Sequence, residues 1–463
     1  MTQTVELPLW LFVLIVLFAA VTFASHFLFP SVRWFFRHRL ERAVARLNKR
    51  LERPIQPFKL ARRHDMIQRL IYDPQVGQAV SDHADAEGIP EAVAFEKARG
   101  YAREIVPSFS AFTYFSFAIR LARFLSNAFY NVRLDYQNEA AVKGIDPSAT
   151  VVFVMNHRSN MDYVLITYLA AQRSALSYAV GEWARVWPLS RLIRAMGAYF
   201  IRRKSGSDLY RQVLASYVRH ATEAGVAQAM FPEGGLSLSG TLGRPKLGLL
   251  KYIIDGSDPE KRDVVFVPVA LNYDRVLEDT ILTTAANRAE RRFRARIGVI
   301  MGWVLKQIWR RITGRYKRFG YAAVRYGEPL SLRTFQDSTD EDLTIPLARE
   351  LMSRIGSAVP VLPVPFVSWQ INRNGPMTHT DLANVLADWN SARSPADVSA
   401  LIDEGVKQLK DRRIIVEQGG AYAIGPERPD LLRYYAASVD HLLRHEKVVD
   451  AAVAENDAAT AGS

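Results

Sequence analysis

A histidine and an aspartate five residues apart are the side chains of this sequence best suited to move a proton. His157 follows an apolar run that ends near Met155, and a helical pattern begins near Asn160, two residues before Asp162. On one continuous helix the two side chains would point in different directions, but from the loop before the helix the chain can fold back so that the carboxylate reaches the ring. The carboxylate would fix the tautomer of the ring, and the second ring nitrogen can then accept a proton from an attacking hydroxyl. The pattern predicts a general base at the carboxyl edge of a sheet, where α/β proteins bind ligands; a histidine that only caps the helix is the alternative.

A basic cluster follows a second apolar run. Residues 197–204 read Gly-Ala-Tyr-Phe-Ile-Arg-Arg-Lys and end in three consecutive cations, Arg202, Arg203 and Lys204. Guanidinium and ammonium groups at a strand end suit a phosphate. A solvated basic loop is the alternative.

A glycine-rich turn follows a third apolar run, in the segment Phe-Pro-Glu-Gly-Gly-Leu-Ser at 231–237. Glycine allows close backbone approach, and its amide can hold an oxyanion or a phosphate; an ordinary turn is the alternative. A fourth segment, Val-Pro-Val-Ala-Leu-Asn-Tyr at 267–273, places a proline in a short apolar strand and is uninformative by itself.

In this order, the four segments resemble the motifs of the glycerolipid acyltransferase family: H-x4-D, G-x-x-F-I-R-R, F-P-E-G-x-x-S, and V-P with a later tyrosine. The resemblance covers about residues 150–330 and is strongest to bacterial glycerol-3-phosphate acyltransferases. The segment Leu-Arg-Tyr-Tyr-Ala-Ala-Ser at 432–438 is also similar to that branch. The family implies an α/β fold with a central mixed sheet flanked by helices.

The resemblance implies a role for each matching residue. His157 would be the general base, Asp162 would orient it, and Glu233 with Gly234 would shape the acceptor site. The residues implied to bind substrate are Arg158, Ser159, Arg202, Arg203, Lys204, Gly235, Ser237, Arg244, Lys246 and Pro268, of which Arg202 and Arg203 would contact the acceptor phosphate and Pro268 would help to place the acyl chain. The acceptor hydroxyl would attack the thioester of an acyl-CoA or an acyl carrier protein directly, without a covalent acyl-enzyme, a metal or another cofactor.

One departure from the family pattern bears on the acceptor. The glycerol-3-phosphate branch usually has arginine where this chain has Leu236 and Leu238. Arg244 and Lys246 would compensate in part, while leucines would favour a more lipidic acceptor. The sequence thus predicts transfer to the sn-1 hydroxyl of glycerol 3-phosphate in phospholipid biosynthesis, with lysophosphatidate or another lysolipid as the alternative acceptor.

The composition narrows the kinds of partner and of functional site that the chain can have. The 463 residues carry a formal charge of +13, which suggests an anionic partner such as a membrane surface, nucleic acid or phosphorylated metabolites. Cysteine is absent, which excludes disulfides, thiolate zinc sites, iron–sulfur clusters and a cysteine nucleophile.

The apolar run at 7–29 is long enough to cross a bilayer as a helix. Arginines and lysines follow it from Arg33 to Arg50, and no small-residue cleavage site separates them, which disfavours a signal peptide. Because positive residues stay cytoplasmic, we expect a single-pass protein of the cell (inner) membrane with a cytoplasmic catalytic domain.

Five regions are expected along the chain: a transmembrane anchor at 1–30, a helical membrane-associated region at 31–135, an acyltransferase domain at 136–335, a mostly helical C-terminal domain at 336–448 and a disordered tail at 449–463. Buried strands are predicted at 151–155, 198–201, 227–231, 264–269 and 322–326, alternating with helices such as 209–221 and 247–254.

Two further segments are amphipathic. Residues 108–130 predict a helix that packs on the core or lies on a membrane, and the very basic stretch 286–318 predicts a helix attracted to anionic lipid. Residues 377–425 fit either a small winged helix or a helical cap with one hairpin. A non-catalytic membrane regulator and a tethered nucleic-acid binder are the competing functions; no motif supports nucleic acid as a partner.

Overall fold

The computed structural model describes residues 8–135, 138–169, 174–181, 184–187, 189–202, 207–258, 260–287, 309, 318–337, 342–389 and 394–444. The chain divides into two compact units, Met1–Ile55 and Gln56–Ser463. Most of the predicted basic helix at 286–318 and the predicted tail at 449–463 lie outside the described residues.

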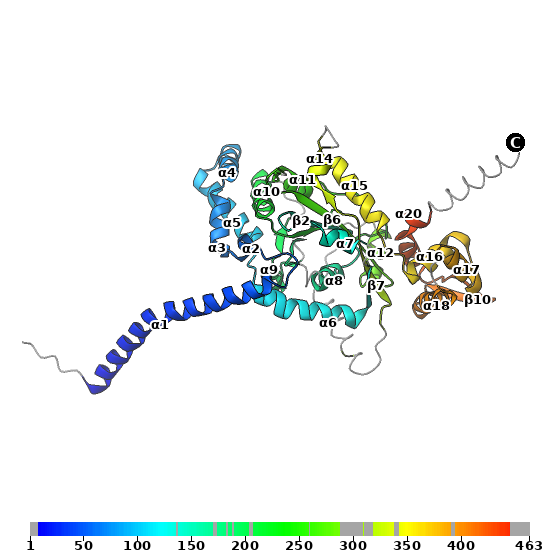
Figure 1. Ribbon diagram of the computed structural model, residues 1–463, viewed down its shortest axis with the longest axis horizontal. Coiled ribbons are helices and arrows are strands. Elements are labelled where there is room, and N and C mark those ends of the chain that lie inside the picture. Colours follow the sequence, from blue (N-terminus) through cyan, green and yellow to red (C-terminus); the bar gives the residue numbers. More distant parts are fainter. Residues whose placement is uncertain are drawn as a thin grey trace, which may run out of the picture. The chain divides into compact units, whose positions relative to one another are not determined.

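The first unit consists of one long helix, α1, Leu9–Asn48 (Figure 1). This helix does not end after the apolar run but continues into the arginine-rich segment that follows it. Over the part of the chain that the structure describes, no helix has the length and apolar character needed to cross a membrane. The predicted transmembrane anchor is therefore not supported.

The second unit is built on a mixed sheet with the strand order β1-β7-β6-β2-β5-β3-β4, in which β8 also pairs with β6 (Figure 1). The central strand β2 lies parallel to both β5 and β6, whereas β7 runs antiparallel to β6. The predicted α/β class with a mixed sheet is confirmed. The strands are β1 Asn131–Asp135, β2 Thr150–Met155, β3 Ser177–Gly181, β4 Tyr199–Ile201, β5 Gln228–Met230, β6 Val264–Tyr273, β7 Tyr321–Tyr326 and β8 Leu330–Ser331.

Helices cover both faces of this sheet, as the side chains of β2 show. Val151 and Phe153 point into one apolar cluster, and Val152 and Val154 point into the other, as expected for a strand of period two that is buried on both faces. The first cluster includes side chains from α6 Ile119–Phe129, α8 Met161–Leu169 and α12 Asp279–Asn287. The second includes side chains from α3 Arg63–Ile71, α4 Pro74–Glu87, α5 Glu91–Ile105, α10 Asp208–Glu223, α11 Gly248–Asp255, α14 Leu332–Gln336 and α15 Thr344–Ser357. The short helices are α2 Pro57–Leu60, α7 Glu139–Lys143 and α9 Leu189–Ala195.

The predicted amphipathic helix at 108–130 is present as a π-helical turn, η1 Thr113–Ala118, continued by α6. Tyr114 and Ala122 are buried on its inner face. Phe112, Phe117 and Phe124 are exposed on its outer face. The helix therefore packs on the core and also presents aromatic rings to solvent.

Residues 363–424 form a winged helix, one of the two arrangements that the sequence allowed. The helix α16 Pro363–Asn374 is followed by β9 Met377–Thr378, α17 His379–Trp389, α18 Pro395–Asp411, β10 Ile415–Gln418 and β11 Ala421–Ile424, with the strand order β10-β11-β9. Gly419 and Gly420, both with positive φ, form the hairpin turn. The chain ends, among the described residues, with α19 Pro429–Ala437 and α20 Asp440–Leu443.

The helix at the recognition position of the winged helix is more acidic than basic. In a helix-turn-helix the second helix enters the major groove; here that helix, α18, carries four acidic and two basic side chains. Its Gln408 also donates from Nε2 to the carbonyl of Arg318. The nucleic-acid reading gains no support.

Candidate active site

The loop between β2 and α8 carries the central side chains of the site. Asn156, His157, Arg158 and Ser159 are all buried. Asn156 fixes the start of the loop to β6, because its Nδ2 donates to the carbonyl of Leu271 and its Oδ1 accepts from the Leu271 amide, at 2.9 and 2.8 Å. The loop is therefore held rigidly at the carboxyl end of β2.

The predicted pairing of His157 with Asp162 is present: Nδ1 lies 2.8 Å from Oδ2 of Asp162. The same oxygen accepts from the amides of Arg158 and Ser159, at 2.7 and 3.0 Å. The other oxygen accepts from the hydroxyl of Tyr273 at 2.6 Å. A carboxylate is an acceptor only, so the proton of the neutral imidazole is placed on Nδ1 and the lone pair on Nε2.

The imidazole ring of His157 is also held by aromatic side chains. It stacks on Phe231, with ring centroids 4.1 Å apart and planes at 24°, and Tyr163 meets it edge-on at 5.4 Å. Within the described residues, no hydrogen bond engages Nε2. The ring therefore has a fixed orientation and a nitrogen available to a ligand.

Glu233 connects the histidine loop to the glycine-rich segment. Its Oε1 accepts from the His157 amide at 2.9 Å and its Oε2 from the Gly243 amide at 2.7 Å. Burial raises the pKa of this carboxyl, against the opposing effects of the two amides and of Arg158. Both oxygens of Glu233 are thus engaged, and the side chain ties the histidine loop to the glycine-rich segment.

Gly234 and Ser237 lie in the same glycine-rich segment and add to its contacts. Gly234 has φ of 64°, and a Cβ there would lie 2.7 Å from Cδ of Lys246. The Ser237 amide donates to the His157 carbonyl at 3.0 Å, and its hydroxyl donates to the Thr241 carbonyl at 2.7 Å. Gly235 is half-buried in the same turn. Ser237, expected to bind substrate, is instead engaged by its own segment.

The predicted phosphate cluster is only partly described, because Arg203 and Lys204 lie outside the described residues. Arg202 donates from Nε and Nη2 to the carboxylate of Glu104, at 2.9 and 2.7 Å, and its guanidinium lies over the rings of Tyr101 and Tyr210. Arg185 contacts the same carboxylate. Arg202 therefore shares the carboxylate of Glu104 with Arg185.

Two other cations lie beside the glycine-rich turn. The Lys246 amide donates to the Pro232 carbonyl at 2.8 Å, and a Cβ on Gly234 would lie 3.2 Å from its Nζ. Lys246 and Arg244 are exposed, and neither has an ion-pair partner among the side chains that the structure describes. These are cations with the freedom to meet an anionic acceptor.

Arg158 is buried with its hydrogen-bonding capacity mostly unused. Its Nη2 donates to the Ser438 carbonyl at 3.3 Å. Its Nε and Nη1 have no partner in the described part of the chain. Its positive charge lowers the pKa of Glu233 and of Tyr434, against the larger effect of burial, which raises both.

Pro268 and Ser159 were both expected to bind substrate. Pro268 is buried within β6, and its carbonyl accepts from the Gly327 amide at 2.9 Å. The Ser159 hydroxyl donates to Glu278 at 2.7 Å. The structure therefore gives both residues internal contacts.

Sequence reasoning missed Glu278 and gave no role to Tyr273. Glu278 also accepts from the Asn160 amide and side chain, at 3.2 and 3.0 Å, and burial raises its pKa. Tyr273 was visible as the later tyrosine of the fourth motif, but no local pattern marks Glu278. Among the described residues, no group of three or more His, Asp or Glu side chains is arranged to hold a metal ion.

Leu236 and Leu238 give the site an apolar side. Both are half-buried and pack against the cluster that includes Met161 and Tyr178. Phe231 and Tyr163 pack against the same cluster. The surroundings of His157 are therefore largely apolar, with Lys246 and Arg244 at the edge.

Comparison with known proteins relates this site to a family. Residues 133–272 match the family model described as Acyltransferase. Glycerol-3-phosphate acyltransferase of Pseudomonas entomophila (strain L48) is 31% identical over 287 residues, 60% of this chain and 33% of that one. The protein of the same name from Pseudomonas fluorescens (strain Pf0-1) is 27% identical over 425 residues, 83% of this chain and 49% of that one. The chain thus spans a third to a half of the length of these curated relatives.

Among solved structures, the 1-acyl-sn-glycerophosphate (LPA) acyltransferase PlsC of Thermotoga maritima matches 52% of this chain and 76% of that chain, with 18% identity and a TM-score of 0.32.

Proposed function

We propose that this chain, which carries a domain of the acyltransferase family and is related to bacterial glycerol-3-phosphate acyltransferases, transfers a fatty acyl group from a thioester to a hydroxyl of a glycerol-phosphate-type acceptor. The observation that carries the proposal is the buried His157–Asp162 pair, whose carboxylate has four donors and whose Nε2 faces no protein partner among the described residues. This arrangement suits proton removal from a neutral hydroxyl.

In the proposed reaction, Nε2 of His157 accepts the hydroxyl proton as the oxygen attacks the thioester carbonyl. The new C–O bond forms, the C–S bond breaks, and the imidazolium returns its proton to the leaving thiolate. Asp162 holds the ring in the required tautomer and stabilises the transient positive charge. No bond to the protein forms, so the acyl group passes directly from donor to acceptor, with an acyl-CoA or acyl carrier protein as the thioester.

For the acceptor we propose glycerol 3-phosphate, acylated at the sn-1 position, because the relatives carry that name. Lys246 and Arg244 would meet its phosphate, since Arg202 is bound to Glu104. Lysophosphatidate is the second candidate. It is favoured by the half-buried Leu236 and Leu238, which flank Ser237, the donor to the His157 carbonyl. A leucine contacts an acyl chain well but offers no donor to a phosphate.

We also propose that the protein works at the cytoplasmic surface of the cell membrane. Phe117 in η1 and Phe124 in α6 are exposed, and α6 packs on α8, which carries Asp162. Aromatic side chains of this kind insert at the interface between headgroups and acyl chains. The face would bring the site close to lipid-embedded acyl chains.

The test is acyl transfer from a radiolabelled acyl thioester by the purified full chain in lipid vesicles, with glycerol 3-phosphate and lysophosphatidate offered in parallel. Labelled lysophosphatidate formed from glycerol 3-phosphate would support the main proposal. Labelled phosphatidate from the lysolipid alone would assign the second acceptor. Absence of product with both acceptors, and with a wider panel of lysolipids, would favour a non-catalytic membrane regulator.

A further inference from the structure

We propose that the segment formed by α19 and Ser438, residues 429–438, is a positioning element that holds both halves of the active site around His157. This inference rests on the proposed function and assigns part of the C-terminal region a role in it. The segment contacts the histidine loop at one point and the glycine-rich segment at another. The first contact is one hydrogen bond from Asp162, and the second is two hydrogen bonds from His157.

The first contact is made by Arg158. Its side chain crosses the interior to donate to the Ser438 carbonyl at 3.3 Å, while its backbone amide donates to Asp162 at 2.7 Å. Because Arg158 is 2% exposed, bulk water has little access to this hydrogen bond. The position of Ser438 therefore constrains the backbone that orients the Asp162 carboxylate.

The second contact is made by Gly240, whose backbone lies directly against α19. A Cβ on Gly240 would lie 2.0 Å from the Tyr434 carbonyl oxygen, and its φ is 87°. The Gly240 amide donates to the Ser237 hydroxyl at 3.1 Å. The Ser237 amide in turn donates to the His157 carbonyl at 3.0 Å. Through Gly240 and Ser237, α19 is thus also linked to the backbone of His157, from the side of the glycine-rich segment.

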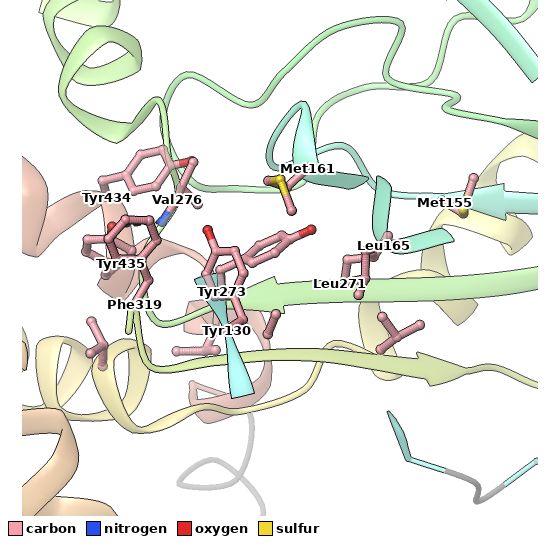
Figure 2. Close-up of a cluster of buried hydrophobic side chains, with 14 of the residues drawn as sticks. Tyr130, Met155, Met161, Leu165, Leu271, Tyr273, Val276, Phe319, Tyr434 and Tyr435 are labelled. Atoms are coloured by element: carbon pink, nitrogen blue, oxygen red, sulfur yellow. Dashed lines mark hydrogen bonds between the residues drawn. The ribbon is translucent and has the colours of Figure 1, made fainter. Parts of the chain in front are cut away.

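Tyr435 fixes α19 in place. Its hydroxyl donates to Asp279 and accepts from the Val276 amide at 3.2 Å. Arg412, which follows α18 of the winged helix, donates to that hydroxyl at 3.0 Å and to Asp279 at 2.6 Å. Figure 2 shows Tyr434 and Tyr435 beside Val276 and next to Tyr273, the donor to Asp162.

The adjacent tyrosines provide a matched pair of variants. The Tyr435 hydroxyl has three partners on two other segments, whereas the Tyr434 hydroxyl, also buried, has none among the described residues. Removing the first hydroxyl releases α19, and removing the second leaves its contacts intact. Both changes delete one oxygen and retain the ring.

The experiment measures kcat and both KM values for Tyr435→Phe and Tyr434→Phe in the acyl-transfer assay. Because small misplacement of a reacting group lowers the rate of the chemical step, we expect Tyr435→Phe to lower kcat by about tenfold to a hundredfold with little change in either KM. Tyr434→Phe should match the wild type. Arg412→Met, which removes an anchor outside α19, should reproduce the effect of Tyr435→Phe.

A stability control and an activity-independent readout complete the design. Ile402→Val, in the winged-helix core, is chosen to lower the melting temperature without contacting α19, and it should leave kcat unchanged. Hydrogen exchange at the amides of 158 and 159, which donate to Asp162, should accelerate in Tyr435→Phe but not in Ile402→Val. An active wild type whose kcat and exchange are both unaffected by Tyr435→Phe would overturn the positioning role. Accelerated exchange in a chain without transferase activity would instead leave the coupling intact and refute the proposed function.

Discussion

At the scale of single residues, the site depends on the carboxylate of Asp162. It binds the imidazole, two loop amides and a tyrosine hydroxyl, so its orientation is fixed by the fold and its interaction with His157 is supported from several directions. The surrounding loop is braced by Glu233 and Glu278. Catalytic strength should therefore depend more on Asp162 than on any one of its donors.

Asp162→Asn and Tyr273→Phe test whether catalysis depends more on Asp162 than on one of its hydrogen-bond donors. The asparagine amide can present a donor to Nδ1 and favour the wrong tautomer, so we expect kcat to fall by a factor of about 10² or more. Tyr273→Phe removes one hydrogen bond to the carboxylate, of a kind worth about 1.5–3 kcal/mol to stability. Because three donors to Asp162 remain, we expect kcat to fall by about tenfold or less. Steady-state rates at saturating substrates decide it; a larger loss in Tyr273→Phe than in Asp162→Asn would contradict the assignment.

The cations provide a second comparison. A charge-assisted contact contributes about 1.5–3 kcal/mol, so Lys246→Met should raise the acceptor KM by about tenfold or more. Arg202→Met should change it less, because that guanidinium is paired with Glu104. Initial rates over a range of acceptor concentrations measure both. If the acceptor KM rose in Arg202→Met alone, the phosphate would instead bind at the basic cluster 202–204 that the sequence predicted.

The sequence identified the residues whose chemistry is local and missed those whose partners are distant. The spacing of His157 and Asp162 predicted their contact, because a five-residue loop brings them together. The binding of Arg202 by Glu104 was not predictable, since 98 residues separate the two. Glu278 escaped notice for the same reason: it reaches Ser159 from 119 residues away.

At the scale of elements, apolar runs predicted β2, β4, β5, β6 and β7 and missed β1, β3 and the two-residue β8. The predicted runs at 151–155 and 264–269 correspond to β2 and β6, which are buried throughout. The strand β1 was missed because polar and charged residues alternate with its apolar ones, as suits a strand at the edge of the sheet. The winged helix required the pairing of β9 with β11, which no local pattern specifies.

The outer face of η1 and α6 is the surface for which we predict a membrane contact. Because the chain has no cysteine, Phe117→Cys introduces a single thiol for an environment-sensitive fluorophore. Anionic vesicles should shift its emission to the blue as the probe enters the interface. Ile345→Cys, an exposed position on α15 over the other face of the sheet, is the matched control and should not shift. Equal responses at both positions would contradict a directed membrane face.

At the scale of the whole molecule, one buried carboxyl joins the sheet to the C-terminal region. Asp274, just after β6, accepts from the amides of Tyr321 and Val364, at 2.7 and 2.9 Å. Burial raises its pKa to about 7, against the opposing effect of these two amides. The native state therefore keeps a proton that the unfolded state releases near pH ~4.

This linkage gives stability a defined pH dependence. Between pH ~4 and ~7 the unfolded state binds fewer protons at Asp274 than the native state does. As the pH rises through this window, the contribution of Asp274 to the free energy of unfolding should therefore fall by about 4 kcal/mol, and above the window it should stay constant. Asp274→Asn should remove this slope, whereas Asp388→Asn, at an exposed position of α17, should retain it. Denaturant unfolding at a series of pH values measures it; parallel wild-type and Asp274→Asn curves would contradict the assignment.

The measurement that tests the account most directly compares His157→Ala with His220→Ala in transfer of a labelled acyl group from its thioester. Both histidines bind an aspartate at 2.8 Å, but His220 pairs with Asp73, away from the glycine-rich turn. We expect His157→Ala to lower turnover by a factor of about 10² or more and His220→Ala to retain wild-type turnover. A His157→Ala protein that transfers acyl groups at the wild-type rate would contradict the proposed chemistry.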